Sequence, residues 1–88
     1  MPCGYILLSI TWSNEAGGKC VLLEELWVAE ELRDQGMGHH MIEEACRRHP
    51  DAVRFRLEVT AANTRAQALY RELGFETLDY LQMIRDCP

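Results

Sequence analysis

The stretch Arg33-Asp34-Gln35-Gly36-Met37-Gly38 is central to the fold because it stands between a strand-like segment and a helix-like one. Its two glycines, two positions apart, let the backbone approach a ligand with no Cβ in the way. The following helix would offer unpaired N–H groups and the positive end of its dipole, which suits a pyrophosphate, and Arg33 can add a charged contact. The alternative is a plain turn between a strand and a helix.

Two other phosphate-binding motifs do not fit this turn. A Walker loop requires Lys-Ser or Lys-Thr after its second glycine, and none is present. A dinucleotide fingerprint requires a third glycine where this sequence has Met41, and the distance from the preceding strand is long.

Two apolar runs precede the turn. They extend from Tyr5 to Trp12 and from Cys20 to Val28, and Asn14-Glu15-Ala16-Gly17-Gly18 between them has the turn chemistry of a hairpin. The sequence therefore predicts that the chain opens with two antiparallel strands. Simple alternation along the second strand would place Glu24 and Glu25 on opposite sides.

A helix and a strand are predicted after the turn. The helix begins near Gly36 and stops before Pro50, because apolar residues recur there at helical spacing, namely Met37, Met41, Ile42, Ala45 and Cys46. From residue 54 to residue 59, apolar and charged residues alternate, which predicts a strand.

A second helix follows, marked by Ala66, Leu69, Tyr70 and Leu73. Asn63 or Thr64 can cap its start, and Gly74 fits a left-handed end. Residues 75–85 predict one or two closing strands. The order strand, strand, helix, strand, helix, strand predicts a mixed α/β (α+β) fold with a partly parallel sheet.

Length and composition narrow the function. The 88 residues predict a single domain spanning residues 1–88, and the 48% hydrophobic content is typical of a globular chain. No apolar run approaches the ~20 residues needed to cross a bilayer, and no basic start precedes the first apolar stretch. We therefore expect a cytoplasmic protein with no membrane partner. The net charge of −5 argues against a nucleic-acid partner.

The cysteines and histidines do not indicate a metal site. The four cysteines, Cys3, Cys20, Cys46 and Cys87, include no CxxC pair, so we expect them to be reduced and structural. His39 and His40 are adjacent, but no third ligand is evident, and we expect no metal.

Beyond the glycine turn, a second stretch carries a family resemblance. It reads Asn63-x-x-Ala66-x-x-Leu69-Tyr70-x-x-x-Gly74-Phe75-Glu76. The turn itself fits R/Q-x-x-G-x-G/A, and Leu23-Glu24-Glu25-Leu26-Trp27-Val28 precedes it as a central strand would. In this order the motifs resemble the GNAT superfamily of N-acetyltransferases, over roughly residues 4–85. The resemblance implies a GNAT-like mixed sheet flanked by helices.

The resemblance also implies acetyl-CoA as co-substrate. Main-chain groups of Leu26 and Val28 would hold the pantetheine arm, an amide near Leu26 would stabilise the oxyanion, and Asn63 would contact the pantetheine region. The alternative for Asn63 is a helix cap alone. The implied cofactor-binding residues are Leu26, Trp27, Val28, Arg33, Asp34, Gln35, Gly36, Met37, Gly38, His39 and Asn63.

For catalysis the resemblance implies Tyr70 as the acid that protonates the departing thiolate, and Glu24 as an acceptor of the amine proton. A phenol suits this task because it stays protonated at neutral pH. The alternatives are that Tyr70 only packs in the core and that Glu24 is a solvated carboxylate.

The sequence departs from the family at its start. A typical member has a strand, two helices and another strand before the point reached at Tyr5, so this chain resembles an N-terminally abbreviated form. Three functions remain open: an N-acetyltransferase acting on a small-molecule amine, a non-catalytic coenzyme A-binding or interaction module, and a nucleotide-binding fragment of another fold.

The apolar run Tyr5–Ile10 would be an unprotected edge strand, which predicts a homodimer. Exchange of the C-terminal strands near Tyr80–Arg85 is a second route to it.

Overall fold

The computed structural model describes residues 4–33 and 35–88. Within this part of the chain, three strands form one sheet in the order β1-β2-β3. The strands are β1 (Gly4–Ser13), β2 (Gly18–Val28) and β3 (Arg54–Leu57). The helices are a short 3-10 turn, η1 (Glu30–Leu32), and two α-helices, α1 (Met37–Arg47) and α2 (Thr64–Glu72). The mixed α/β fold expected from the sequence is confirmed.

The hairpin of β1 and β2 is antiparallel, as predicted. Gly17 closes it with a φ of 81°, and its N–H donates to the carbonyl of Ser13 at 2.8 Å. A side chain would be strained at that positive φ, so a glycine is favoured in this turn.

β3 lies parallel to β2, from the pair Cys20 and Arg54 to the pair Leu23 and Leu57. Parallel neighbours need a long connection, and α1 provides it. β3 ends at Leu57, but β2 continues to Val28. The two strands therefore separate beyond Leu23.

A bulge interrupts β2 at Glu24. Leu7 pairs with Glu25 and Leu8 pairs with Leu23, which leaves Glu24 as the extra residue. Because two residues oppose one at a bulge, the alternation that would put Glu24 and Glu25 on opposite sides does not hold across it. As a result Leu23 and Leu26, three positions apart, both face the core.

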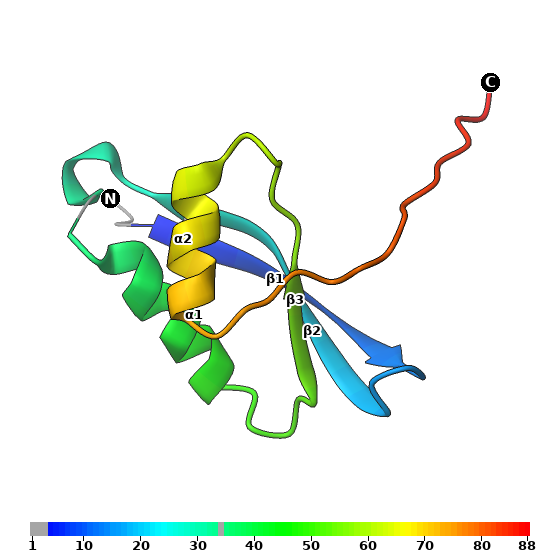
Figure 1. Cartoon of the computed structure of the whole chain (residues 1–88). Coiled ribbons are helices and arrows are strands. Elements are labelled where there is room, and N and C mark those ends of the chain that lie inside the picture. The colour runs from blue at the N-terminus through cyan, green and yellow to red at the C-terminus, as the bar shows by residue number, and fades with distance from the viewer. Residues whose placement is uncertain (1–3, 34) are drawn as a thin grey trace.

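The core lies on one face of the sheet. Val21, Leu23 and Ile42 form its centre, and residues from both helices pack against this cluster, among them Cys46 and Tyr70. Both helices therefore cover the same face, as Figure 1 shows. Other members are Ile6, Leu8, Leu26, Ala52, Phe55, Leu57, Leu73 and Phe75.

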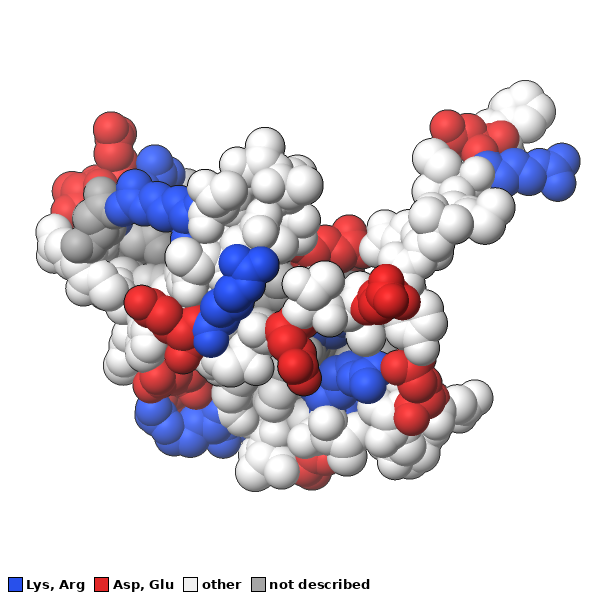
Figure 2. Space-filling view, in the orientation of Figure 1, with Lys and Arg blue, Asp and Glu red and all other residues white. Residues whose placement is uncertain are grey.

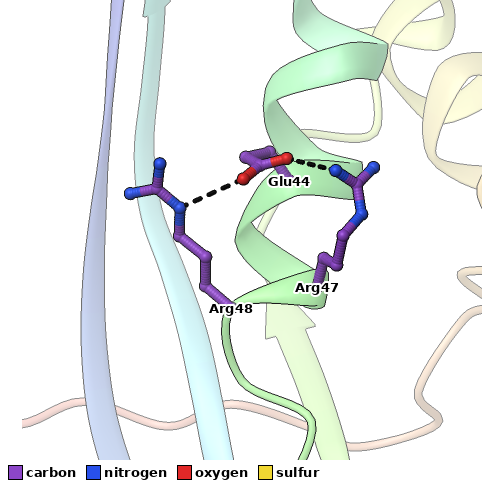
Figure 3. A network of polar contacts seen from close by, with 3 residues as sticks. All are labelled: Glu44, Arg47 and Arg48. Carbon is purple, nitrogen blue, oxygen red and sulfur yellow. Dashed lines mark hydrogen bonds and ion pairs between the residues drawn. The ribbon is translucent and has the colours of Figure 1, made fainter.

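The last turn of α1 carries a small ion-pair network (Figure 3). Glu44 accepts from Arg47 and, at 3.2 Å, from Nε of Arg48. Cations at this end also complement the helix dipole. The two arginine side chains are largely exposed, so the stabilising effect of these ion pairs is small.

The closing strands predicted for residues 75–85 are absent from the structure. A strand requires a paired neighbour, and this segment crosses β3 and then leaves the body instead of running along it (Figure 1). After Phe75, its hydrogen bonds to the rest of the fold are made by side chains: Tyr80 donates to Glu15, and Gln82 donates to Glu58 at 3.3 Å. Among and after these residues, Leu81, Met83 and Ile84 are 88%, 86% and 87% exposed.

On the face shown in Figure 2, acidic and basic side chains are interspersed, and no single sign of charge dominates. No helix in the described part of the chain has the length and apolar character that crossing a membrane requires. Of the cysteines there, Cys20, Cys46 and Cys87 are free, and Cys3 lies outside the described residues.

Candidate active site

The separation of β2 from β3 leaves an open edge on β2. On its other side β2 pairs with β1 as far as Val28, but on this side pairing stops at Leu23. The peptide groups of Glu24 to Val28 that face the gap have no strand partner within the described residues. An extended ligand can bind there as an added strand would, through main-chain hydrogen bonds.

The turn that follows β2 is held from both ends. Arg33 donates from Nε to the carbonyl of Val28 at 3.0 Å, and Gln35 donates from Nε2 to the carbonyl of Glu31 at 2.9 Å. The structure therefore brings Arg33 and Val28 together, two residues that the sequence assigned separately to the cofactor. Asp34, also assigned to it, lies outside the described residues.

The two glycines of the turn have different roles. Gly36 is the N-cap of α1 with a φ of 76°, and it makes no side-chain cap. Gly38 lies in the first turn of α1, where an added Cβ would stand 3.6 Å from side-chain atoms of Leu26 and Leu69. Gly36 thus serves the backbone path, and Gly38 packs the helix start against β2.

The start of α1 fits an anionic group. Its first-turn N–H groups, on residues 37–39, have no acceptor within the helix, and no acidic residue lies in that turn. The His39 side chain is turned along the helix to Glu43, with Nδ1 3.4 Å from the carboxylate. The backbone here suits a phosphate, whereas the His39 imidazole is engaged elsewhere.

Asn63 caps α2. Its Oδ1 accepts from the N–H of Ala66 at 3.1 Å, which is the helix-cap alternative raised by the sequence. The amide nitrogen has no partner among the described residues. Gln67, one turn on, was missed by the sequence analysis: it donates to the carbonyls of Thr60 and Ala61 at 2.9 and 3.1 Å and holds the loop that leads to Asn63.

Tyr70 is positioned by the end of α2. The N–H of Phe75 donates to the carbonyl of Tyr70 at 2.9 Å, and that of Gly74 donates to Arg71 at 3.0 Å, with Gly74 at a φ of 91°. This is a Schellman motif, and it seats the Phe75 ring edge-on to Tyr70 with the centroids 6.0 Å apart. Burial raises the pKa of Tyr70 above its ordinary value of 10.0, so the hydroxyl keeps its proton.

Glu24 and Tyr70 line the same cavity, an open space of about 1200 Å³ beside β3 and α2. A bulge residue and a residue of α2, 46 positions apart in sequence, therefore border one open space. Trp27 differs from its neighbours: its ring stacks on Tyr5, with centroids 5.8 Å apart, and it does not belong to the core cluster.

No group of three or more His, Cys, Asp or Glu side chains that could hold a metal ion occurs in residues 4–33 and 35–88. The adjacent His39 and His40 therefore find no further ligand in that part of the chain.

Comparisons with known proteins agree with this geometry. The model of the acetyltransferase (GNAT) family matches residues 2–75. Comparison with curated proteins gave no match. Because the family model spans most of the chain, the protein belongs to the GNAT acetyltransferase family, as the sequence resemblance implied.

Solved structures share the fold. A protein described as a "probable acetyltransferase" is 28% identical, with a TM-score of 0.78 over 96% of this chain. A GNAT-family acetyltransferase from Streptococcus pneumoniae is 26% identical, with a TM-score of 0.73 over 97% of this chain. An integron cassette protein from V. cholerae, 15% identical, shows the fold alone, with a TM-score of 0.82 over 98% of this chain. The present chain spans 60%, 62% and 54% of the lengths of these three.

Proposed function

We propose that the protein is an acetyl-CoA-dependent N-acetyltransferase that moves an acetyl group to a primary amine of a small molecule in the cytoplasm. One observation carries the proposal: β2 and β3 part at Leu23 and Leu57, and beyond that point Leu26 of β2 lies next to Gly38 at the start of α1. The gap suits an extended pantetheine arm, and the helix start suits its pyrophosphate. Family membership and the likeness to acetyltransferases support the same conclusion.

The proposed reaction is direct transfer. The neutral amine attacks the thioester carbonyl, a C–N bond forms, and the carbonyl electrons move to oxygen, where an amide near Leu26 stabilises them. The C–S bond then breaks, and Tyr70 gives its proton to the departing thiolate. The proton lost by the amine goes to Glu24 or to a water beside it. No acyl-enzyme forms, so positioning and electrostatic stabilisation account for the rate.

The second candidate is a coenzyme A-binding module without turnover. The chain spans 60% and 62% of the lengths of two acetyltransferases of similar fold, so the activity of the whole protein is a proposal and binding without turnover is the alternative to it. Such a module would hold acetyl-CoA in the gap between β2 and β3 without passing the acetyl group to an acceptor.

A calorimetric titration with acetyl-CoA, followed by turnover with a panel of primary amines, tests both candidates. Saturable binding with turnover supports the transferase. Binding without turnover of any amine supports the module. Absence of acetyl-CoA binding contradicts both, and ATP binding in its place would point to a nucleotide-binding fold.

We also propose that the protein is a homodimer. In the described sheet β1 is an edge strand, and it has no lysine or proline from Tyr5 to Ile10 to discourage pairing. Pairing of two β1 strands by a two-fold axis would satisfy both edges at once. Exchange of the C-terminal segment between two protomers is the other route to a dimer, because its residues 81, 83 and 84 are apolar and exposed.

A further inference from the structure

Four side chains stand together on the face of the sheet opposite the helices. Tyr5 pairs with Trp27, and Leu7 pairs with Glu25, at neighbouring positions of the hairpin. The Tyr5 and Trp27 rings are stacked at 25°, and the Tyr5 hydroxyl donates to Oε1 of Glu25 at 2.6 Å. Tyr5, Leu7 and Trp27 are 46%, 50% and 36% exposed. An aromatic surface therefore borders a carboxylate and an aliphatic side chain.

This combination has the chemistry of a cation site. Aromatic faces attract ammonium groups through the ring quadrupole, and a carboxylate beside them adds a charge-assisted hydrogen bond. Glu25 has no basic side chain as partner among the described residues, and its only hydrogen bond there is the one from Tyr5. Its negative charge is thus available to a ligand. Leu7, opposite Glu25, offers an apolar wall to an alkyl chain.

We propose that Tyr5, Leu7, Glu25 and Trp27 anchor a second, non-reacting ammonium group of the acceptor, so that the acceptor is a diamine or a related aminoalkyl cation. This inference rests on the proposed acetyl transfer. It adds a substrate class and a binding site that family membership does not specify.

The location supports the role. Leu26, which precedes Trp27, faces the core and meets Gly38 at the start of α1, whereas Trp27 faces the other way. A thioester lying along the open edge of β2 would therefore have the helices on one side and this aromatic surface on the other. Tyr70 would reach the sulfur from the helix side, and the amine would approach from the side of Glu25.

A simpler role for the same rings is to stabilise the hairpin, because cross-strand aromatic pairs contribute to sheet stability. That role predicts no response to a cation. The two tryptophans provide the test, since Trp12 lies opposite Lys19 at the far end of the same hairpin and is also exposed.

The experiment follows both indole N–H signals by NMR while n-butylammonium is added to the full chain. We expect a saturable shift of the Trp27 signal with no matching shift of Trp12, and a much weaker effect of the neutral isostere n-butanol. Equal shifts of both signals, an equal response to n-butanol, or no response would overturn the proposal. Masking of Trp27 by a dimer interface would appear as no response and would also count against it.

Variants sharpen the test. Glu25→Gln is expected to weaken n-butylammonium binding about fivefold, and Tyr5→Leu similarly, with the Trp12 signal confirming that the hairpin is intact. Glu72→Gln removes one exposed carboxylate of α2 and should leave binding unchanged. In turnover, Glu25→Gln should raise KM for a linear diamine about fivefold with kcat retained, while KM for butylamine stays the same.

The two proposals fail separately. Suppose that acetyl-CoA binds and amines are acetylated, but the Trp27 signal does not respond to cations and Glu25→Gln leaves every KM unchanged. The proposed ammonium site is then wrong, and the proposed transferase activity stands. If Trp27 responds to n-butylammonium but acetyl-CoA does not bind, the cation site stands and its role in acetyl transfer is wrong.

Discussion

Leu23 of β2 and Leu57 of β3 form the last register pair between the two parallel strands. One residue further along β2 the Glu24 bulge begins, and β3 has already ended. The bulge and the strand end coincide, so the sheet opens at one level. Gly38, which lies next to Leu26, and Tyr70, which lines the same space as Glu24 and Leu57, border the region beyond this pair, which makes it the centre of the proposed site.

Replacing either glycine of the turn by valine should abolish stabilisation by acetyl-CoA. Bound to the native state alone, the ligand should stabilise wild type by ~2.7 kcal/mol at a hundredfold excess over its Kd. Gly36→Val strains a φ of 76° and blocks the phosphate approach, and Gly38→Val crowds Leu26 and Leu69. Thermal unfolding with and without acetyl-CoA measures the effect. If both variants keep the wild-type shift, the turn is not the cofactor site.

Alanine at the two positions separates folding from binding. In the free protein Gly36→Ala should lower the free energy of unfolding by about 1–2 kcal/mol, because the alanine Cβ is strained in the left-handed conformation of this position. Gly38→Ala should instead raise the free energy of unfolding by about 0.5–1 kcal/mol, because alanine is favoured over glycine in a helix. Its Cβ would meet Leu26 and Leu69 at 3.6 Å, which is ordinary contact. Chemical denaturation gives both values, and equal losses would contradict the distinct roles assigned here.

Tyr70→Phe should lower turnover by about 10²–10⁴-fold while acetyl-CoA affinity changes little, because the ring and its Phe75 contact remain and only the proton is lost. Steady-state kinetics and calorimetry on the same samples provide the comparison. Unchanged turnover in the folded variant would assign Tyr70 to packing alone.

The raised pKa of Tyr70 also predicts a pH dependence. Burial favours the neutral phenol in the folded state, so the folded pKa lies above the unfolded value of 10.0. Its contribution to stability is therefore fully present below pH 10.0 and is lost as the pH rises through the folded pKa. If Tyr70 is the acid, the pH profile of turnover should fall only above pH 10. A fall near neutral pH would assign the acid to another group.

Substitutions of Asn63 can separate its cap from a cofactor contact. Asn63→Ala should cost about 1 kcal/mol, because the N–H of Ala66 loses its acceptor. Asn63→Ser keeps an oxygen for the cap but removes the amide N–H groups. We therefore expect the serine variant to retain stability and to bind acetyl-CoA more weakly. If serine matches wild type in both respects, Asn63 is a cap and no more.

Sedimentation at micromolar concentration should find a dimer, and Ile10→Lys should convert it to a monomer by charging the β1 edge. Ile10 is 56% exposed, so a lysine can keep its stem packed with its charge in water. Ala68→Lys, an equal charge change on an exposed position of α2, serves as control. Deletion of residues 81–88 tests the other route: loss of the dimer only in this variant would favour strand exchange. A wild-type monomer that binds acetyl-CoA would contradict both.

Local patterns predicted most of the elements. The turn of Gly36 and the left-handed Gly74 depend on the freedom of glycine, and the Asn63 cap depends on a side chain bonding to its own helix, so each is visible in a few residues. The closing strands could not be predicted in this way. Residues 75–85 have the composition of a strand, but a strand also needs a partner, and the path after Phe75 takes the segment across β3.

The sequence by itself determined the order of the elements from β1 to α2, the caps and turns that bound the helices, and the motifs that mark the family, because these rest on interactions within a few positions along the chain. Tertiary structure decided where the strands part and which side chains meet there. The Glu24 bulge shifts the facing of β2, so Leu26 lies on the core and Glu25 lies with Tyr5 and Trp27 on the opposite face. Strand register is set by pairing between distant segments and by the packing of a whole face, and no local pattern encodes it.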